Sequence, residues 1–241
     1  MNIFKKVYCR AFQTVFRLAI PFLPYREPEI LNGVEELAAL LKDKNVRAAL
    51  LVTDAGIRKA GITAPLEELL EKNGVRVAVY DGTRANPTAA NVEEARELYM
   101  RENCECLIAV GGGSSMDCAK AVGARIAYSE KSLDRLKGLL RVLRPIPLLI
   151  AVPTTTGTGS ETTLAAVITD GEKKHKYTMN DFTLIPRYAV LDPCVTYTLP
   201  AHLTATTGMG ALTHAVEAFI GRSTTRETKK KALEATALIF G

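Results

Sequence analysis

The sequence predicts an α/β fold, in which a Rossmann-like domain with a parallel sheet is followed by an all-helical domain. Three observations support this prediction. Helix-like and strand-like segments alternate with short connections from Glu29 onward. Two strand-like runs end in loops of glycine, serine and threonine, and after Asp192-Pro193 only helical periodicity remains. We therefore expect an α/β domain at residues 29–192 and the start of a helical domain at residues 193–241.

Residues 1–28 form an N-terminal extension. Positions 3–20 have the period of an amphipathic helix, with apolar side chains on one face and basic or polar side chains on the other. Arg17 interrupts the apolar run and no small-residue cleavage site follows, which argues against a signal peptide or a membrane-spanning helix. Such a helix can lie on an anionic membrane, but we favour docking on the chain's own domain or on a neighbouring subunit.

Predicted helices and strands alternate regularly through the body of the chain. Helices are expected at residues 34–42, 64–73, 88–102 and 119–127, strands at 46–53, 75–80, 106–110 and 147–152, and a hairpin at 164–179. Two further helices follow at 200–221 and 226–240. Because crossovers between parallel strands are right-handed, the carboxyl ends of the strands should share one edge of the sheet.

The turn Gly111-Gly112-Gly113 lies between the strand at 106–110 and a helix, and Ser114 follows it. Residues without a Cβ let a pyrophosphate approach the backbone, and the free N–H groups of a first helical turn point toward such an anion. Ser114 or Ser115 can cap the helix, and Asp117 suits its first turn electrostatically. Glycine turns also join strands to helices for geometric reasons, so this turn alone is moderately specific.

A second loop, residues 153–161, offers threonine hydroxyls and backbone amides after the strand at 147–152. Neither loop ends in Gly-Lys-Ser/Thr, which argues against a P-loop NTPase and favours a dinucleotide held between the two loops. Asp54 ends another strand. Its carboxylate can accept hydrogen bonds from both ribose hydroxyls and would repel a 2′-phosphate, which favours NAD over NADP. On position alone, Asp54 more commonly caps the next short helix.

Composition excludes several classes of protein. The chain has 241 residues, of which 47% are hydrophobic and 24% charged, as is typical of a soluble globular protein. The net charge of +5 is mild and scattered, with its densest run at residues 229–231, which argues against nucleic-acid binding. Five cysteines without a Cys-x-x-Cys pair argue against a disulfide framework or a zinc ribbon, so a reducing cytoplasm fits best.

Together the two loops resemble the iron-containing, group III alcohol dehydrogenase family. The likeness continues through Asn86-Pro87-Thr88, Leu191-Asp192-Pro193 and residues 207–218, and it covers the chain from about Gly33 to its end. The resemblance implies a dehydroquinate synthase-like architecture, an NAD cofactor, a divalent iron or zinc ion, a small alcohol or aldehyde substrate and a possible homo-oligomer. Family chains continue further as a helical bundle, so this one looks truncated.

The resemblance also implies which residues contact the cofactor. Gly112, Gly113, Ser114 and Asp117 would take the pyrophosphate and the nearby ribose. Thr154, Thr155 and Thr158 would line the adenine and phosphate side. Asp54 matches a residue that contacts the ribose, Asn86 an asparagine close to the dinucleotide, and Lys176 a lysine near the cofactor. Lys176 can equally be a solvated lysine among its basic neighbours.

The metal ligands of the family are an aspartate and a histidine one helical turn apart, followed by two later histidines. His214 matches the first histidine, but Gly210 stands at the aspartate position and contributes no ligand. Glu217 lies on the same helix face, so a His/Glu pair is geometrically possible, although the matching family glutamate is not a ligand. We do not expect this chain alone to bind a metal.

The function that the resemblance implies is hydride transfer between an alcohol and a nicotinamide cofactor, dependent on a metal. These residues identify no general base. An alternative is a non-catalytic nucleotide-binding fragment or degenerate paralogue, which Gly210 favours. A dehydroquinate synthase-like lyase shares the architecture, but the threonine loop and residues 208–217 fit the alcohol dehydrogenases better.

Overall fold

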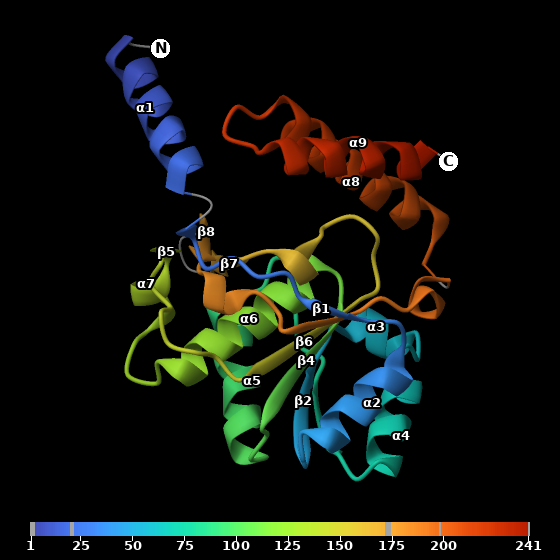
Figure 1. Ribbon diagram of the computed structural model, residues 1–241. Coiled ribbons are helices and arrows are strands. Elements are labelled where there is room, and N and C mark those ends of the chain that lie inside the picture. The colour runs from blue at the N-terminus through green and yellow to red at the C-terminus, as the bar shows by residue number, and fades with distance from the viewer. Residues whose placement is uncertain (1–2, 20–21, 172–174, 198, 241) are drawn as a thin grey trace. The chain divides into compact units, whose positions relative to one another are not determined.

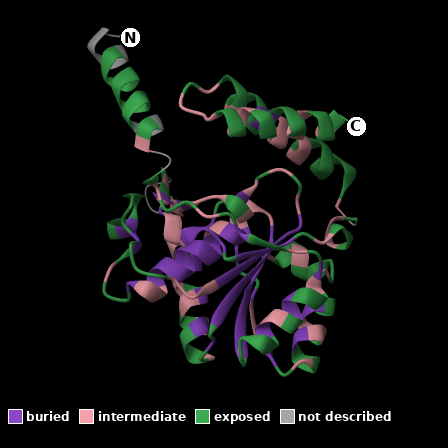
Figure 2. Ribbon diagram, viewed as in Figure 1, coloured by how far each residue is buried: buried purple, intermediate pink, exposed green. Residues whose placement is uncertain are grey.

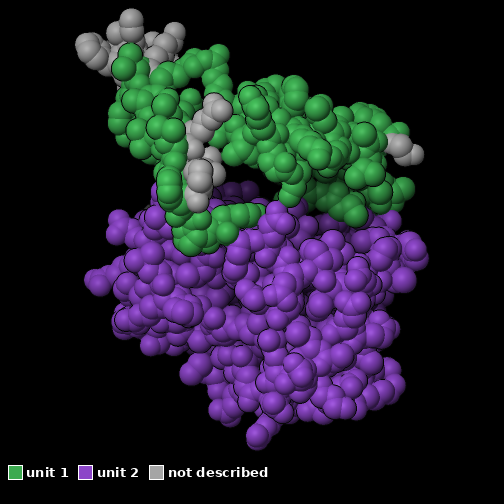
Figure 3. All heavy atoms as spheres, viewed as in Figure 1, with its two compact units in different colours: residues 1–25, 156–158, 200–241 green, residues 26–155, 159–199 purple. Residues whose placement is uncertain are grey.

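The computed structural model describes residues 3–19, 22–171, 175–197 and 199–240 (Figure 1). It divides into two compact units (Figure 3). The larger unit, residues 26–155 and 159–199, contains the sheets. The smaller unit, residues 1–25, 156–158 and 200–241, contains the helices α1 (Ile3–Ala19), α8 (Ala201–Ile220) and α9 (Arg226–Phe240).

Among the described residues, six parallel strands form the main sheet in the order β1-β9-β6-β4-β2-β3, which confirms the predicted α/β class. The strands are β1 (Glu29–Leu31), β2 (Ala48–Val52), β3 (Arg76–Tyr80), β4 (Cys106–Gly111), β6 (Leu148–Pro153) and β9 (Tyr188–Val190). Every residue of β2 and β4 is buried (Figure 2). Continuous apolar runs suit strands that are covered on both faces.

Helices cover both faces of this sheet. They are α2 (Val34–Asp43), α3 (Ala55–Lys59), α4 (Ala64–Lys72), α5 (Ala89–Arg101), α6 (Gly113–Ala127) and α7 (Leu133–Leu136). Along β2, Leu50 and Val52 pack in the hydrophobic cluster with α5 and α6, while Ala49 and Leu51 pack with α2 and α4. Alternate residues of a strand point to opposite faces, so this division shows a sheet between two helical layers.

A small sheet in the order β5-β8-β7 lies in the same unit. β5 (Gly138–Leu139) pairs with β8 (His175–Asn180), which pairs antiparallel with β7 (Ala165–Asp170) as the predicted hairpin. Of the predicted turn, Glu172 lies outside the described residues. The Thr169 N–H donates to the Pro87 carbonyl over 2.8 Å, and this bond ties the hairpin to the turn after β3.

Among the described residues from Pro193 onward, no strand occurs and the helices α8 and α9 pack on each other, as expected. Short 3₁₀ helices complete the fold: η2 (Ser160–Thr162), η3 (Phe182–Leu184) and η4 (Pro193–Thr196). The N-terminal segment is helical over Ile3–Ala19, and the predicted last residue, Ile20, lies outside the described part. Within the described residues, no helix combines the length and apolarity needed to cross a membrane.

Candidate functional site

The glycine turn and the threonine loop leave the sheet side by side. Gly111 and Pro153 are the last paired residues of β4 and β6. Just beyond them, the Thr154 N–H donates to the Gly111 carbonyl over 3.0 Å. The two loops therefore begin at the same point on the carboxyl edge of the sheet, where open α/β folds bind their ligands.

Gly111 requires glycine, and Gly112 lies against the threonine loop. Gly111 has a φ of +146°, and a Cβ placed there would lie 2.5 Å from Ser115 Oγ. A Cβ on Gly112 would lie 3.4 Å from Thr155 Oγ1, in contact with the threonine loop. A side chain at Gly111 would collide with the first turn of α6, and one at Gly112 would fill space beside the threonine loop. Their absence brings backbone N–H groups to the surface of the turn.

α6 begins at Gly113, six residues earlier than predicted, with Gly112 as its N-cap residue. The expectation that Ser114 or Ser115 caps the helix is wrong, because both lie inside its first turn and no side chain caps it. A first turn without a capping side chain keeps its N–H groups available to a ligand, and the helix dipole favours an anion there. Gly112, Gly113 and Ser114 thus stand together where a phosphate group would fit.

Buried hydroxyls surround the turn. Among the described residues, Ser115 Oγ, Thr154 Oγ1 and Thr155 Oγ1 have no hydrogen-bond partner, and neither does Thr53 Oγ1 at the end of β2. Ser115 and Thr154 are each 1% exposed. Buried polar atoms in folded proteins are almost always hydrogen-bonded. Hydroxyls in this state fit a polar ligand with several oxygen atoms, such as a pyrophosphate.

Asp54 follows β2 and caps α3. Its Oδ1 accepts hydrogen bonds from the N–H groups of Gly56 and Ile57 over 2.9 and 3.1 Å, so the helix-cap alternative is confirmed. Its Oδ2 faces the glycine turn, since a Cβ on Gly111 would lie 3.6 Å from it. One oxygen therefore holds the helix, and the other is positioned beside the phosphate cradle.

Asn86 links the cradle to the hairpin. It adopts a left-handed conformation with a φ of +61°, and its N–H donates to Ser114 Oγ over 3.3 Å. The next residue, Pro87, accepts the hydrogen bond from Thr169, which is paired across the hairpin with Lys176. Lys176 is exposed and lies on the hairpin, next to the turn that contains Asn86.

Asp117 does not face the cradle in the way that we expected. Its two carboxylate oxygens accept hydrogen bonds from Ser160 Oγ–H over 3.0 Å and from the Val167 N–H over 3.1 Å. Burial raises the pKa of this carboxyl, against the charge of Lys120 and the two hydrogen bonds, which lower it. The carboxylate supports the connector between β6 and β7, and a phosphate would be repelled by it.

Lys120 was not singled out from the sequence. It is fully buried, and its ammonium donates hydrogen bonds to the same connector. The sequence feature that could have indicated it is the Asp-x-x-Lys spacing, which places Asp117 and Lys120 on one helix face.

Thr158 belongs to residues 156–158 of the smaller unit. Within that unit a Cβ on Gly157 would lie 2.2 Å from the Thr207 carbonyl oxygen, so the loop touches the backbone of α8.

The described residues do not fit a divalent metal. His214 and Glu217 are exposed on α8, and a Cβ on Gly210 would meet no atom within 4 Å. Across the described chain, no group of three or more histidine, cysteine, aspartate or glutamate side chains comes together. A catalytic metal centre in a protein takes about three protein ligands, so His214 stays a predicted ligand without a site around it.

The parallel sheet, the glycine turn and the threonine loop define a Rossmann-like, dinucleotide-binding class of protein. The model of the iron-containing alcohol dehydrogenases matches residues 30–193, which include all three features. The chain belongs to the iron-containing alcohol dehydrogenase family.

Individual relatives agree with this assignment. The chain is 43% identical over 187 residues to choline dehydrogenase of Bacillus subtilis, covering 77% of this chain and 46% of that protein. It is 37% identical over 208 residues to NAD-dependent methanol dehydrogenase of Bacillus methanolicus, covering 86% and 54%. The solved alcohol dehydrogenase from Oenococcus oeni superposes with a TM-score of 0.85 at 33% identity, covering 89% and 58%. The chain thus spans about half the length of the relatives that it matches.

Proposed function

We propose that this chain is the dinucleotide-binding part of an NAD-dependent alcohol dehydrogenase that interconverts a small alcohol and its carbonyl product. The observation that supports this most is the cradle at Gly111 and Gly112, which buried hydroxyls without partners surround. Membership of the family supplies the reaction class. The nicotinamide of a bound cofactor supplies the chemistry, which is the acceptance and return of a hydride.

In this proposal, the chain binds and orients the cofactor. The first-turn N–H groups of Gly113 and Ser114 bind the pyrophosphate, helped by the dipole of α6. The hydroxyls of Thr154 and Thr155 donate to phosphate oxygens from the other side. Asp54 Oδ2 accepts hydrogen bonds from the ribose hydroxyls, and its charge disfavours the extra 2′-phosphate of NADP.

Oxidation of an alcohol also needs help in losing the hydroxyl proton, which a divalent metal gives by stabilising the developing alkoxide. The described residues do not provide a fitting set of ligands for such an ion. Gly210 is therefore the observation that favours a second candidate function, nucleotide binding without turnover by this chain. Both candidates share the cofactor site and differ in whether alcohol is consumed.

The experiment is a titration of the purified chain with NADH and with NADPH, followed by nicotinamide fluorescence. We expect NADH to bind more tightly. Asp54→Asn keeps an oxygen for the α3 cap but removes the charge, so NADH affinity should fall and the preference over NADPH should shrink about tenfold or more, as one lost charge-assisted bond implies. Asp192→Asn is the matched control, because Asp192 caps η4 in the same manner.

Two results would contradict the proposal: wild-type chain that binds neither nucleotide, or an Asp54 variant with unchanged preference. Turnover is tested separately, by adding methanol or a longer primary alcohol with NAD and with Fe²⁺ or Zn²⁺. Formation of NADH supports the dehydrogenase candidate for this chain, and binding without turnover supports the second candidate.

A further inference from the structure

α6 carries two charged side chains three residues apart on one face, the half-buried Asp117 and the buried Lys120. Lys120 is 0% exposed, which is rare for a lysine because burying an ammonium is costly unless it is paired or hydrogen-bonded. Among the described residues, no carboxylate lies within ion-pair distance of its Nζ atom. The proposed cofactor chemistry assigns this residue no role.

The ammonium is held by backbone carbonyls. Its Nζ atom donates to the carbonyl oxygens of Ser160 over 2.7 Å, of Thr163 over 2.9 Å and of Ala165 over 2.9 Å. The hydroxyls of Ser160 and Thr163 approach the same atom at 3.3 and 2.9 Å. An ammonium has three N–H donors, so one donor is available for each carbonyl.

Asp117 binds the same stretch of chain in the opposite sense. It accepts the hydrogen bonds of the Ser160 hydroxyl and of the Val167 N–H. Lys120 thus satisfies acceptors of residues 160–165, and Asp117 satisfies donors of residues 160–167. The first part of this connector lies outside the β7 ladder, so α6 supplies the hydrogen bonds that a sheet would otherwise provide.

The connector begins directly after the threonine loop. The amino end of that loop is tied to the glycine turn by the bond from Thr154 N–H to the Gly111 carbonyl. We propose that Lys120 is a positioning residue, whose buried ammonium ties the carboxyl end of the threonine loop to the helix that starts at the glycine turn. This role rests on the proposed function, in which the two loops bind one dinucleotide.

The consequence is a cofactor site whose two halves are held together before the cofactor arrives. Ordering a loop on binding weakens affinity, so a loop that is already ordered binds more tightly. Lys120 is not a phosphate ligand in this arrangement, because the three donors of its ammonium are already matched by the three carbonyls. Its effect on the cofactor is therefore indirect.

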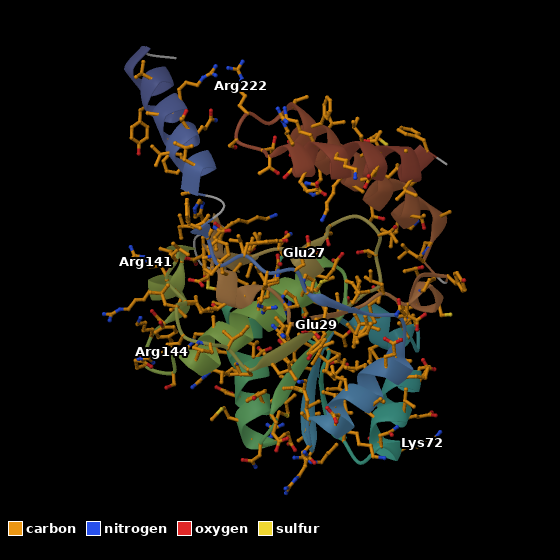
Figure 4. All side chains as sticks on the ribbon, viewed as in Figure 1. Glu27, Glu29, Lys72, Arg141, Arg144 and Arg222 are labelled. Atoms are coloured by element: carbon orange, nitrogen blue, oxygen red, sulfur yellow. The ribbon has the colours of Figure 1, made fainter. Side chains whose placement is uncertain are left out.

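Hydrogen exchange of the full chain without nucleotide tests the proposal apart from cofactor binding. Lys120→Met has a similar length and no donor. We expect amides of residues 161–167 to exchange at least tenfold faster, while those of β2 and β4 stay protected. Lys72→Met is the matched control, because Lys72 is exposed on α4 (Figure 4), and it should change neither region. Unchanged protection at 161–167, or equal loss throughout the sheet, would overturn the proposal.

The wild-type chain gives a second readout that needs no variant. Burial lowers the pKa of Lys120 to about 8, against the charges of Asp117 on α6 and Glu161 on η2, which raise it. An opening that exposes Lys120 to water restores its ordinary pKa, so the opening takes up a proton and becomes less favourable as pH rises. After correction for intrinsic rates, exchange at 161–167 should therefore slow above about pH 8, and a flat profile would contradict the proposal. NADH affinity is then compared between wild type and Lys120→Met. If neither binds NADH, the proposed function fails, while the exchange result still decides the role of Lys120.

Discussion

At the scale of single residues, the cradle depends on positions where a side chain is missing. Gly111 combines a backbone conformation that favours glycine with a distance of 2.5 Å from a would-be Cβ to Ser115 Oγ. Both effects act where β4 ends and α6 begins. A change there affects the strand, the helix and the surface offered to a phosphate together.

Gly111→Ala should lower the free energy of unfolding by about 1–3 kcal/mol, the usual range for a residue forced into a sparsely populated conformation. It should also weaken NADH binding, because α6 must shift to relieve the contact. Urea unfolding and nucleotide titration measure the two effects. Gly61→Ala separates their causes, since Gly61 has a φ of +72° but no atom within 4 Å of its would-be Cβ. It should lose stability and keep NADH binding.

Lys120 makes stability depend on pH in a definite direction. Its folded pKa of about 8 lies below the ordinary 10.5, so between these values the unfolded chain holds more protons than the folded chain. The contribution of Lys120 to stability therefore rises with pH across that window, by ~3 kcal/mol at most. We would measure urea unfolding of both proteins at about pH 7.5 and about pH 9.5. The free energy of unfolding of wild type should rise relative to that of Lys120→Met between these two pH values. A constant difference between the two proteins would refute this assignment.

At the scale of elements, α8 is a long helix with glycine in its interior. Gly210 has no atom within 4 Å of its would-be Cβ, so the surroundings give no packing reason for a glycine. Gly210→Ala should stabilise the helix by about 1 kcal/mol, which thermal unfolding monitored by circular dichroism can detect. Gly221→Ala is the contrasting variant, because its Cβ would lie 2.9 Å from Thr224 Cγ2 and should destabilise the helix end. A loss of stability in Gly210→Ala would show that this position makes contacts not apparent from its open surroundings.

The helices and strands also show which parts of the fold could be predicted from the sequence. Long apolar runs with regular alternation predicted the sheet and its covering helices, because burial on both faces leaves a strong pattern. β1 and β9 have three residues each and are too short to show a period. The start of α6 was misplaced, because three glycines have low helix propensity and only the tertiary context makes Gly113 helical.

Some side chains of the candidate site could likewise be placed from the sequence, and others could not. Positions at strand ends, such as Asp54 and Gly112, follow from the order of elements. The partners of Asp117 and Lys120 lie 40 or more residues away, and their burial arises from the packing of α6 on the β6–β7 connector. A helix pattern cannot show which side chains will be desolvated by a segment so distant in sequence.

At the scale of the whole molecule, the core belongs to the larger unit. All residues of the two buried hydrophobic clusters fall between positions 31 and 190. Among the described residues of 200–240, only Ala215 and Ala232 are buried. The α/β unit therefore has its own core, which is the requirement for folding alone.

A fragment of residues 26–199 should fold. We expect a cooperative thermal transition and dispersed NMR amide signals, with a melting temperature within about 10 °C of the full chain, as the loss of a few kcal/mol implies. The complementary fragment of residues 200–241 serves as the comparison and should lack a cooperative transition, because two helices bury few residues between them. An unfolded 26–199 fragment would mean that the helical unit contributes to the core.

The strand order sets the sequence of events during synthesis. β1 pairs with β9, and Glu29 faces Tyr188 across that ladder, while β9 also forms the outer neighbour of β6. At ordinary rates of translation, roughly ten to thirty seconds separate the emergence of these two strands from the ribosome. Until then β6 presents an open apolar edge, the kind that joins strands of other chains. The yield of soluble protein should thus depend on translation speed and chaperone supply more than on the stability of the finished fold.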